Sequence, residues 1–143
     1  MRLYFRKTQR LTRERDFKSV LAHKCLVRQG VMRLYAAPNG LGFARFAVSL
    51  GRRCGKAVDR NRLKRLAREA FRRHQHDLPP GRDYLLILSA QKPIKKKSPA
   101  ARLFGYAAFE AHFLDLVKKL SKKDCFQLKK DAPDTEPVDI DRL

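Results

Sequence analysis

"SLGRRCGKAVDRNRLKRLAREAFRRH", residues 49–74, is the stretch that decides the fold of this chain. It passes from the end of an alternating apolar segment, through a glycine-bounded basic loop, into a region of helical periodicity. Apolar residues recur there at spacings of three and four, as on one face of a helix: Leu63, Leu66, Ala67, Ala70 and Phe71. We therefore expect a helix that starts near residues 58–60, where Asp59 opposes the positive end of the helix dipole.

The opposite face of this expected helix is basic. The residues between about 100 and 200 degrees around the helix from Leu63 are Asn61, Lys64, Arg65, Arg68 and Arg72. We expect one ion pair on this helix, between Arg65 and Glu69. The other like charges repel one another, and a phosphate backbone lying along them would remove that repulsion. A merely solvated face is the alternative interpretation, although such faces normally intersperse charges of both signs.

The charge of the whole chain favours a polyanionic partner. The formal net charge is +20 over 143 residues. Residues 131–143 hold five acidic residues and one basic residue, so residues 1–130 carry 33 basic against 9 acidic residues, a net +24. Nucleic acid is the first candidate partner and a membrane surface is the second. The sequence holds no apolar run long enough to span a bilayer and no hydrophobic signal segment, so we expect a cytoplasmic protein.

The sequence offers no recognisable set of catalytic or metal-binding side chains. Cys25, Cys54 and Cys125 lie far apart, without the short paired spacings of a tetrahedral zinc site, and the four histidines add no second half to such a site. No pair of carboxylates, Ser/His/Asp set or thiol with a histidine is recognisable either. We expect no catalytic residue and no metal or cofactor bound by the polypeptide alone.

The segments before the basic helix predict a helix and a hairpin. Residues 1–11 are interpreted as a basic extended arm, and Thr12 as the N-cap of a helix that runs to about His23. From Leu26 to Ala37 the residues alternate, with a break at Gly30, which predicts strand structure. "PNGLG", residues 38–42, predicts a turn into a return strand at residues 45–50.

The segments after the basic helix predict a strand and a closing helix. "HDLPPG", residues 76–81, ends the basic helix, because proline cannot continue it. "DYLLILSA", residues 83–90, is almost continuously apolar, which is typical of a central strand covered on both faces. Residues 91–102 predict a polar and basic loop. The last helix has an apolar face formed by Leu103, Tyr106, Ala107, Phe113, Leu114, Val117 and Leu120.

One domain is the simplest organisation for a chain of this length. We assign residues 1–130 to a single domain, with nucleic acid as its first candidate partner. Residues 131–143 form an acidic tail with too little apolar surface to offset its ordering entropy, so we expect this tail to be disordered.

Three stretches of the chain resemble a known family. "RNR", residues 60–62, with basic residues at positions 64, 65 and 68, resembles the signature of the bacterial ribonuclease P protein component family. "RLTRERDFKSVL", residues 10–21, resembles that family's first helix, and "RLY", residues 33–35, its early strand. The resemblance implies an α/β fold, an α+β sandwich similar to domain 2 of ribosomal protein S5, with the order α-β-β-β-α-β-α. It also implies a left-handed β-α-β crossover, against the right-handed rule for such units.

The resemblance also implies a function in which this chain is not the catalyst. In that family a large RNA subunit holds the active site and its magnesium ions, and it cleaves precursor tRNA to leave a mature 5′ end. This chain would be the protein subunit of that endoribonuclease, with the ribonuclease P RNA and precursor tRNA as partners. No DNA, membrane or obligate protein partner is expected.

Two RNA-binding surfaces follow from the resemblance. The catalytic RNA would be bound by Arg52, Arg53, Lys56, Arg60, Asn61, Arg62, Lys64, Arg65 and Arg68. The single-stranded 5′ leader of the precursor would lie in a cleft between the first helix and the sheet, against Phe17, Leu21, Arg33 and Tyr35. The two aromatic rings would stack on bases and Arg33 would pair with a phosphate. Leu21 stands where some members have a second aromatic residue, and either aromatic residue could instead be plain core.

Two other functions stay open at this point. A non-catalytic ribosomal or other structural-RNA-binding protein would have the same composition. A DNA-binding helix-turn-helix protein would need a second helix three or four residues before the basic one, where this sequence predicts a strand and a glycine loop.

Overall fold

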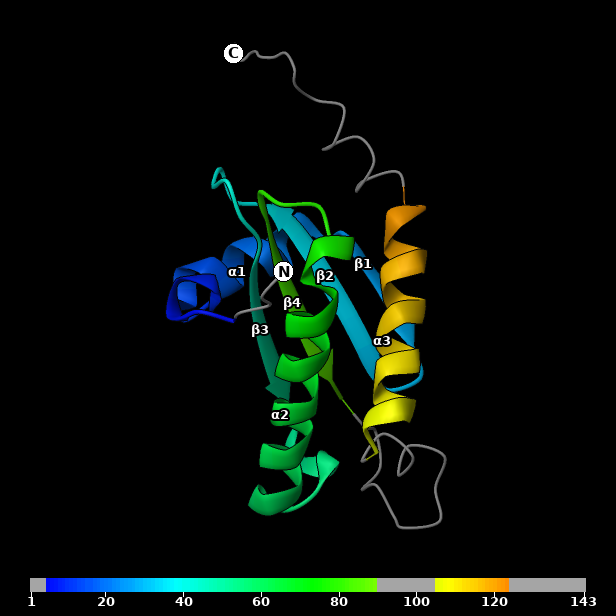
Figure 1. The fold of residues 1–143 in the computed structure, drawn as a ribbon. Coiled ribbons are helices and arrows are strands. Elements are labelled where there is room, and N and C mark those ends of the chain that lie inside the picture. The colour runs from blue at the N-terminus through cyan, green and yellow to red at the C-terminus, as the bar shows by residue number, and fades with distance from the viewer. Residues whose placement is uncertain (1–4, 90–104, 124–143) are drawn as a thin grey trace.

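The computed structural model describes residues 5–89 and 105–123, which form a four-stranded sheet with three α-helices (Figure 1). In chain order the elements are α1 (Glu14–His23), β1 (Leu26–Gln29), β2 (Met32–Pro38), β3 (Arg45–Leu50), α2 (Ala57–His74), β4 (Arg82–Leu88) and α3 (Tyr106–Ser121). Short 3₁₀ helices lie at Lys7–Gln9, Arg52–Cys54 and Gln75–Asp77. The basic loop expected at residues 91–102 and the acidic tail expected at residues 131–143 lie outside the described residues.

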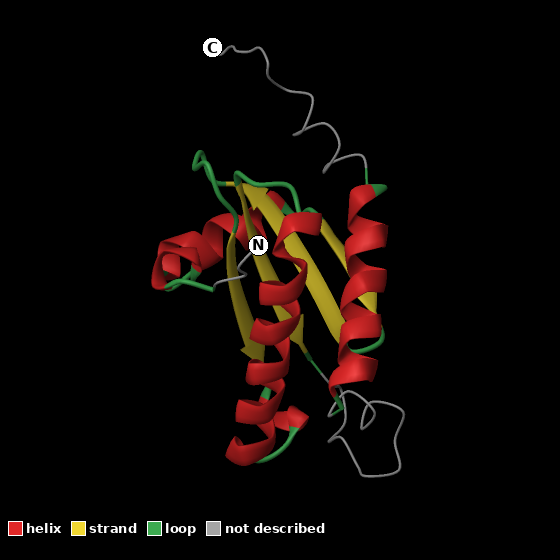
Figure 2. Ribbon diagram, viewed as in Figure 1, coloured by secondary structure: helices red, strands yellow, loops and turns green. Residues whose placement is uncertain are grey.

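The strands form one mixed sheet in the order β1-β2-β4-β3. Strand β2 pairs antiparallel with both β1 and β4, and β3 pairs parallel with β4. The almost continuously apolar β4 is central, as predicted, and all its residues except Ile87 are buried. Helices α2 and α3 cover one face of the sheet, and α1 lies on the other face (Figure 2).

The β3-α2-β4 unit is left-handed. In Figure 1, β3 and β4 both run downward, α2 returns upward in front of the sheet, and β4 lies to the right of β3. A right-handed crossover with the same strand direction would place β4 to the left of β3. This hand is the one that the family resemblance implies, and it is the exception to the general rule.

The main core lies between the sheet and the pair of helices α2 and α3. Phe46 of β3 and Phe71 of α2 stack with their ring centroids 4.6 Å apart and their planes 9° apart. Phe113 of α3 meets Phe46 edge-on at 6.3 Å. Each such aromatic pair stabilises a core by about 0.5–1.5 kcal/mol beyond its area burial. This packing gives α2 a fixed position on the sheet, so the exposed face of α2 has a fixed position too.

The amino-terminal segment is docked on the core, and a 3₁₀ helix at Lys7–Gln9 interrupts the predicted extended arm. Phe5 meets Phe46 and Phe71 edge-on, with centroids 6.2 and 5.4 Å away. Arg10 forms a parallel bridge with Phe46, and the backbone N–H of Leu11 donates to the carbonyl oxygen of Phe46 at 3.0 Å. The Leu11 side chain is buried. Burial of Phe5 and Leu11 outweighs the conformational entropy that a free arm would keep.

Helix α1 begins later than predicted. Its N-cap is Arg13, which makes no side-chain capping hydrogen bond, and Thr12 is exposed. Because residues 10 and 11 are held against β3, the chain reaches helical geometry only at Glu14. Acidic residues Glu14 and Asp16 occupy the first turn, where they complement the helix dipole.

Helix α3 buries a face that was only partly predicted. Its buried residues are Phe109, Phe113, Leu116 and Leu120. Ala107 is exposed, although it was predicted to be apolar core, and Leu103 lies outside the described residues. The helix begins at Tyr106, and its four buried residues follow one another at spacings of four, three and four. Phe113 is one of them, whereas the neighbouring Leu114 is only partly buried.

Candidate nucleic-acid interface

A buried cysteine anchors the basic loop that precedes α2. The 3₁₀ helix at residues 52–54 presents Arg52 and Arg53 to solvent, while Cys54 is fully buried. The Cys54 Sγ donates to the backbone oxygen of Leu88, the last residue of β4, at 3.4 Å. The loop is therefore attached to the centre of the sheet. A strand and a 3₁₀ helix precede α2, so the second helix that a helix-turn-helix protein needs is absent from residues 45–56.

Gly55 makes the turn from this loop into α2. Its φ is +125°, and a Cβ added there would lie 2.8 Å from side-chain atoms of Asp59. Both features require glycine. The turn brings the backbone N–H of Lys56 to the Asp59 Oδ2 at 3.3 Å, and this bond satisfies a donor at the start of the helix. Arg52, Arg53 and the first turn of α2 are thereby fixed relative to each other.

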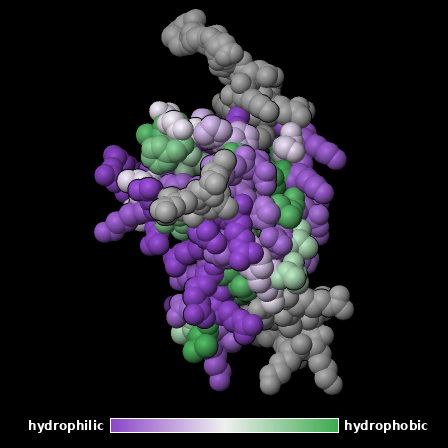
Figure 3. All heavy atoms as spheres, viewed as in Figure 1, coloured by the Kyte–Doolittle hydropathy of each residue, from purple (hydrophilic) through white to green (hydrophobic). Residues whose placement is uncertain are grey.

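Helix α2 is amphipathic, as the sequence predicted. Its buried residues are Leu63, Ala67, Ala70 and Phe71, and Leu66 packs partly buried against the same core. The other face of α2 carries six of the nine residues proposed for the catalytic RNA, and the loop that precedes the helix carries Arg52, Arg53 and Lys56. Seven of them are exposed, Arg52, Arg53, Lys56, Asn61, Arg62, Arg65 and Arg68, and two are partly buried, Arg60 and Lys64. Figure 3 shows the resulting hydrophilic surface over the face of α2 that is turned toward the viewer.

The charges on this face have no acidic partner in the described parts of the chain. No ion pair there involves any of the eight Lys and Arg side chains of the proposed set. Arg60 also has an unsatisfied donor, because its Nε is buried and has no hydrogen-bond partner. We call this set of exposed and partly buried cations, with Asn61, the α2 basic face.

Glu69 of α2 pairs with other arginines than the one predicted. Glu69 was expected to pair with Arg65, but Arg72 Nε and Nη2 donate to its two carboxylate oxygens at 2.9 and 2.7 Å, and Arg73 Nε donates at 2.8 Å. The Arg72 hydrogen bond and, to a smaller extent, Arg73 lower the pKa of Glu69 to about 2, against the opposing effect of its partial burial. Arg65 forms no ion pair with Glu69 or with any other carboxylate of residues 5–89 and 105–123, so its charge is uncompensated there.

Two hollows flank the middle of the α2 basic face. One, of about 650 Å³, lies between the amino-terminal segment and the helix, and Phe5, Arg10, Arg62 and Tyr106 are among its lining residues. The other, of about 400 Å³, is lined by Val58, Asn61, Lys64, Arg65 and Arg68. Arg65 and Arg68 line both hollows. Sequence reasoning missed Phe5 and Arg10, because only the docking of residues 5–11 brings them beside α2.

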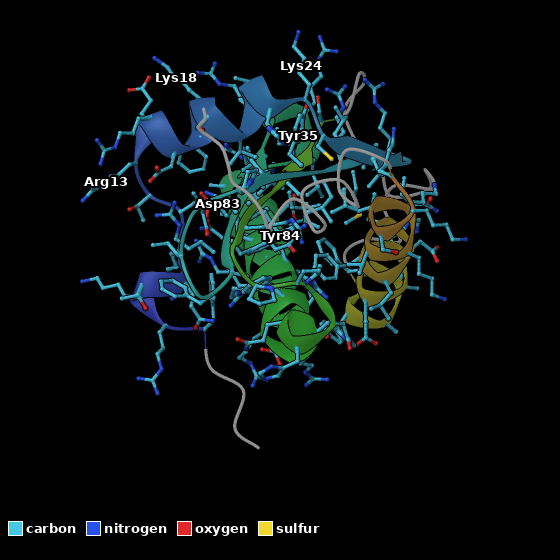
Figure 4. All side chains as sticks on the ribbon, turned by 90° about the horizontal axis from the view of Figure 1, so that it is seen from above. Arg13, Lys18, Lys24, Tyr35, Asp83 and Tyr84 are labelled. Atoms are coloured by element: carbon cyan, nitrogen blue, oxygen red, sulfur yellow. The ribbon has the colours of Figure 1, made fainter. Side chains whose placement is uncertain are left out.

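The second set of predicted residues gathers on the α1 side of the sheet. Phe17 of α1 and Tyr35 of β2 both pack, partly buried, against a small apolar cluster, which consists of Val20, Ala37 and Leu85. In Figure 4, seen from above, Tyr35 lies on the α1 side of the sheet and Tyr84 on the α2 side. Each ring is therefore partly packed in the core and partly accessible to solvent. A role in the core and a role in base stacking are compatible for both residues.

Arg33 and Leu21 complete that set. Arg33 lies two residues before Tyr35 on β2, so its side chain leaves the same face of the sheet, and it is partly buried. Leu21, four residues after Phe17 on α1, has 40% of its surface exposed, which is high for a leucine, and it is not among the residues that pack against the cluster. We call Phe17, Leu21, Arg33 and Tyr35 the α1-side surface.

An ion-pair network that the sequence did not predict holds α1 against the sheet. Arg45 of β3 donates through Nε and Nη2 to the two oxygens of Asp83 on β4, both at 2.7 Å. Its Nη1 lies 3.5 Å from the Asp16 Oδ2 of α1. The hydrogen bonds that Arg45 donates to Asp83 raise the pKa of Arg45 above its usual value. Asn39 Nδ2 also donates to Asp83 Oδ1, at 2.9 Å. The network fixes the position of Asp16, one residue before Phe17.

The structure was also searched for metal-ligand clusters and membrane spans. Residues 5–89 and 105–123 contain no group of three or more His, Cys, Asp or Glu side chains placed to share a metal ion. None of the helices in those ranges has both the length and the apolar character of a transmembrane span.

Comparisons with known proteins agree with this geometry. The family model described as Ribonuclease P matches residues 5–121. The ribonuclease P protein component of Petrotoga mobilis is 32% identical over 116 residues, which cover 81% of this chain and 94% of that protein. The protein of the same name from Methylococcus capsulatus is 35% identical over 118 residues, covering 82% and 88%.

A solved structure is similar over most of its length. The RNase P protein from Thermotoga maritima superposes with a TM-score of 0.63 at 30% identity, covering 77% of this chain and 96% of that one. The similarities in sequence and structure favour the ribonuclease P interpretation over a ribosomal or other structural-RNA-binding protein. They extend across the α1-side surface and the α2 basic face alike, and they show that the chain belongs to the ribonuclease P protein family.

Proposed function

We propose that this chain assists an RNA catalyst in removing the 5′ leader from precursor tRNA, by binding the catalytic RNA and the leader on opposite faces of its sheet. The observation that carries the proposal is the α2 basic face. A buried apolar stripe fixes α2 on the sheet and so fixes the position of the cations that the helix carries. No carboxylate in the described residues neutralises them. A surface built in this way has its charges in place before RNA arrives, so binding requires little ordering.

The α2 basic face would bind the ribonuclease P RNA through its phosphates. Each phosphate that an arginine or lysine neutralises releases condensed counterions, which drives association and makes it depend on salt. Guanidinium groups suit this task because they donate two parallel hydrogen bonds to phosphate oxygens. Neutralising the RNA would also lower the magnesium concentration at which the RNA folds and docks its substrate. The magnesium ions of the active site belong to the RNA in this proposal.

The α1-side surface would bind the single-stranded leader. The accessible parts of Phe17 and Tyr35 offer stacking platforms, and base stacking on an aromatic ring contributes about 1–3 kcal/mol per base. Arg33, which leaves the same face of β2, would pair with a leader phosphate. Exposed Leu21 offers apolar contact without a π face, so its contribution should be weaker.

A cleavage assay tests this function. The catalytic RNA is mixed with a 5′-labelled precursor tRNA at low magnesium, with and without the protein, and release of the leader is followed. We expect the protein to restore cleavage at magnesium concentrations where the RNA alone is slow. The protein carrying Arg65→Ala and Arg68→Ala should restore it less, and the matched variant Lys18→Ala with Lys118→Ala should act like the unmodified chain. Cleavage that is independent of the protein would contradict the proposal.

A further inference from the structure

A third basic surface lies at the edge of the sheet, apart from the two surfaces described above. Strand β1 is the edge strand there, and the end of α3 packs beside it. Between them lies a hollow of about 630 Å³, whose basic lining residues are Lys24, Arg28, Lys119, Lys122 and Lys123. Its two other lining residues are apolar, and none of its lining residues within 5–89 and 105–123 is acidic. We call this hollow the β1/α3 groove.

The five cations come from three different parts of the chain. Lys24 is the C-cap of α1, Arg28 lies on β1, and the three remaining lysines lie in or just after the last turn of α3. Lysines at the end of a helix complement its dipole, which accounts for the α3 lysines alone. The convergence of Lys24 and Arg28 on the same hollow needs another explanation.

Lys24 holds an unfavourable backbone conformation. Its φ of 58° and ψ of 26° lie in the left-handed region, and it is the only residue other than glycine with positive φ in residues 5–89 and 105–123. For an L-residue this costs about 1–2 kcal/mol, which glycine at this common helix-end position would avoid. Figure 4 shows Lys24 at the end of α1. The chain thus places a cation where glycine would be more stable.

The groove is fixed in shape, and its charge is uncompensated. Lys119 Nζ donates to the backbone oxygen of Arg28 at 2.9 Å and to Gln29 Oε1, so the end of α3 is attached to β1. Both acceptors are neutral. Across the described ranges, no ion pair involves any of the five groove cations. Such a cluster favours a polyanion as its ligand.

The groove continues the α1-side surface across neighbouring strands. In the antiparallel pairing of β1 with β2, Arg28 lies opposite Arg33, and Leu26 opposite Tyr35. Directly opposed residues of such a pair extend their side chains from the same face. A single strand that stacks on Tyr35 and pairs with Arg33 therefore meets Arg28 next, at the edge of the sheet, and the lysines of the groove beyond it.

We propose that the β1/α3 groove binds backbone phosphates of the precursor leader, at nucleotides farther from the cleavage site than those on the α1-side surface. This proposal rests on the proposed function, because it extends the path of the leader. Phosphate contacts position a strand without reading its sequence. The groove should accordingly make affinity depend on leader length and on salt, and leave it independent of leader sequence.

The test compares leader lengths in the complex of the full chain with the catalytic RNA. The groove variant is Arg28→Ala with Lys122→Ala and Lys123→Ala, all exposed positions, while Lys119 and Lys24 are kept because they shape the backbone. The matched control is Lys7→Ala with Lys18→Ala and Lys118→Ala, which removes three exposed charges elsewhere. Binding of precursor tRNA is measured with leaders from none to about ten nucleotides, within the range that single-strand sites span. Thermal melting checks that both variants fold like the unmodified chain.

The expected result depends on leader length. With long leaders the groove variant should bind about tenfold more weakly than the control, and the slope of log affinity against log salt should fall by about 2, since each lost single-strand phosphate contact removes about 0.7. With the shortest leaders the two should bind alike. Equal binding at every length would overturn the proposal. Weaker binding at every length, tRNA without a leader included, would also overturn it, because the groove would then contact the catalytic RNA or the tRNA body.

A variant of the α1-side surface separates this proposal from the proposed function. If Tyr35→Ala weakens binding only of substrates with a leader while the groove variant matches the control, the groove proposal alone fails. If the unmodified chain shows no preference for a leader at all, leader binding itself fails and the groove proposal fails with it.

Discussion

At the scale of the residue, Tyr35 divides its surface between the core and the proposed leader site. Tyr35→Ala should weaken binding of leader-bearing precursor by about 1–3 kcal/mol, because one stacking platform is lost. Tyr35→Phe keeps the ring and should bind like the unmodified chain. Affinities for substrates with and without a leader measure the effect. Equal losses for both substrates would show that Tyr35→Ala acts through the fold and not through a base.

Gly55 is a second residue with a decisive local role. Gly55→Ala should lower the free energy of unfolding by about 1–3 kcal/mol, because the residue would hold a left-handed φ and its Cβ would clash with Asp59. Urea denaturation measures this loss. Gly42→Ala is the matched control, since a Cβ there meets nothing within 4 Å, and it should change stability by less than about 0.5 kcal/mol. Similar values for the two variants would contradict the role of the turn.

The residue scale also shows where sequence reasoning stopped. The spacing of Arg65 and Glu69 allowed an ion pair, but spacings of three and four residues toward Arg72 and Arg73 allow one as well. In the structure Glu69 pairs with Arg72 and Arg73, and Arg72 makes a forked contact with its two carboxylate oxygens. Spacing along a helix names the possible partners of a side chain. Rotamers and the neighbouring Tyr106 ring, over which the Arg73 guanidinium lies at 4.9 Å, select among them.

At the scale of the element, Glu69 makes the stability of the carboxyl-terminal part of α2 depend on pH. Its pKa in the folded chain is about 2, lowered chiefly by Arg72, so the ion pair stabilises the fold at pH values above the unfolded pKa and is lost as pH falls from about 4.5 toward 2. At pH 6 the variant Glu69→Gln should therefore have a lower melting temperature than the unmodified chain. The difference should be small, because the ion pair is partly solvated. The two melting temperatures should converge near pH 2. A constant difference would contradict this assignment.

The element scale separates well-predicted segments from poorly predicted ones. The strand at residues 45–50, the basic helix and the central strand β4 were predicted within three residues of their observed bounds, because each has a strong period of 2 or 3.6 or a clear breaker beside it. The start of α1 and the buried face of α3 were predicted less well. In both, a contact distant in sequence decides the outcome: residues 10 and 11 against β3, and α3 against β1 and α2.

At the scale of the whole molecule, the sheet separates the two proposed RNA surfaces. The α1-side surface and the α2 basic face lie on opposite faces of it (Figure 4). Because the two sets share no partner, Tyr35→Ala combined with Arg65→Ala and Arg68→Ala should weaken binding of precursor by the sum of the separate effects, within about 0.3–0.5 kcal/mol. A double-mutant cycle on the complex with the catalytic RNA measures the sum. A larger coupling energy would mean that one surface alters the other.

The sequence by itself determined the elements, their order and the basic face of α2, because periodicity and local charge are properties of residues close together in the chain. The tertiary structure decided the left hand of the β3-α2-β4 crossover, the docking of residues 5–11, the partners of Glu69 and the convergence of Lys24 and Arg28 with the end of α3. These features join residues far apart in sequence. Their free energies depend on which surfaces pack together, and no repeat in the sequence records that choice.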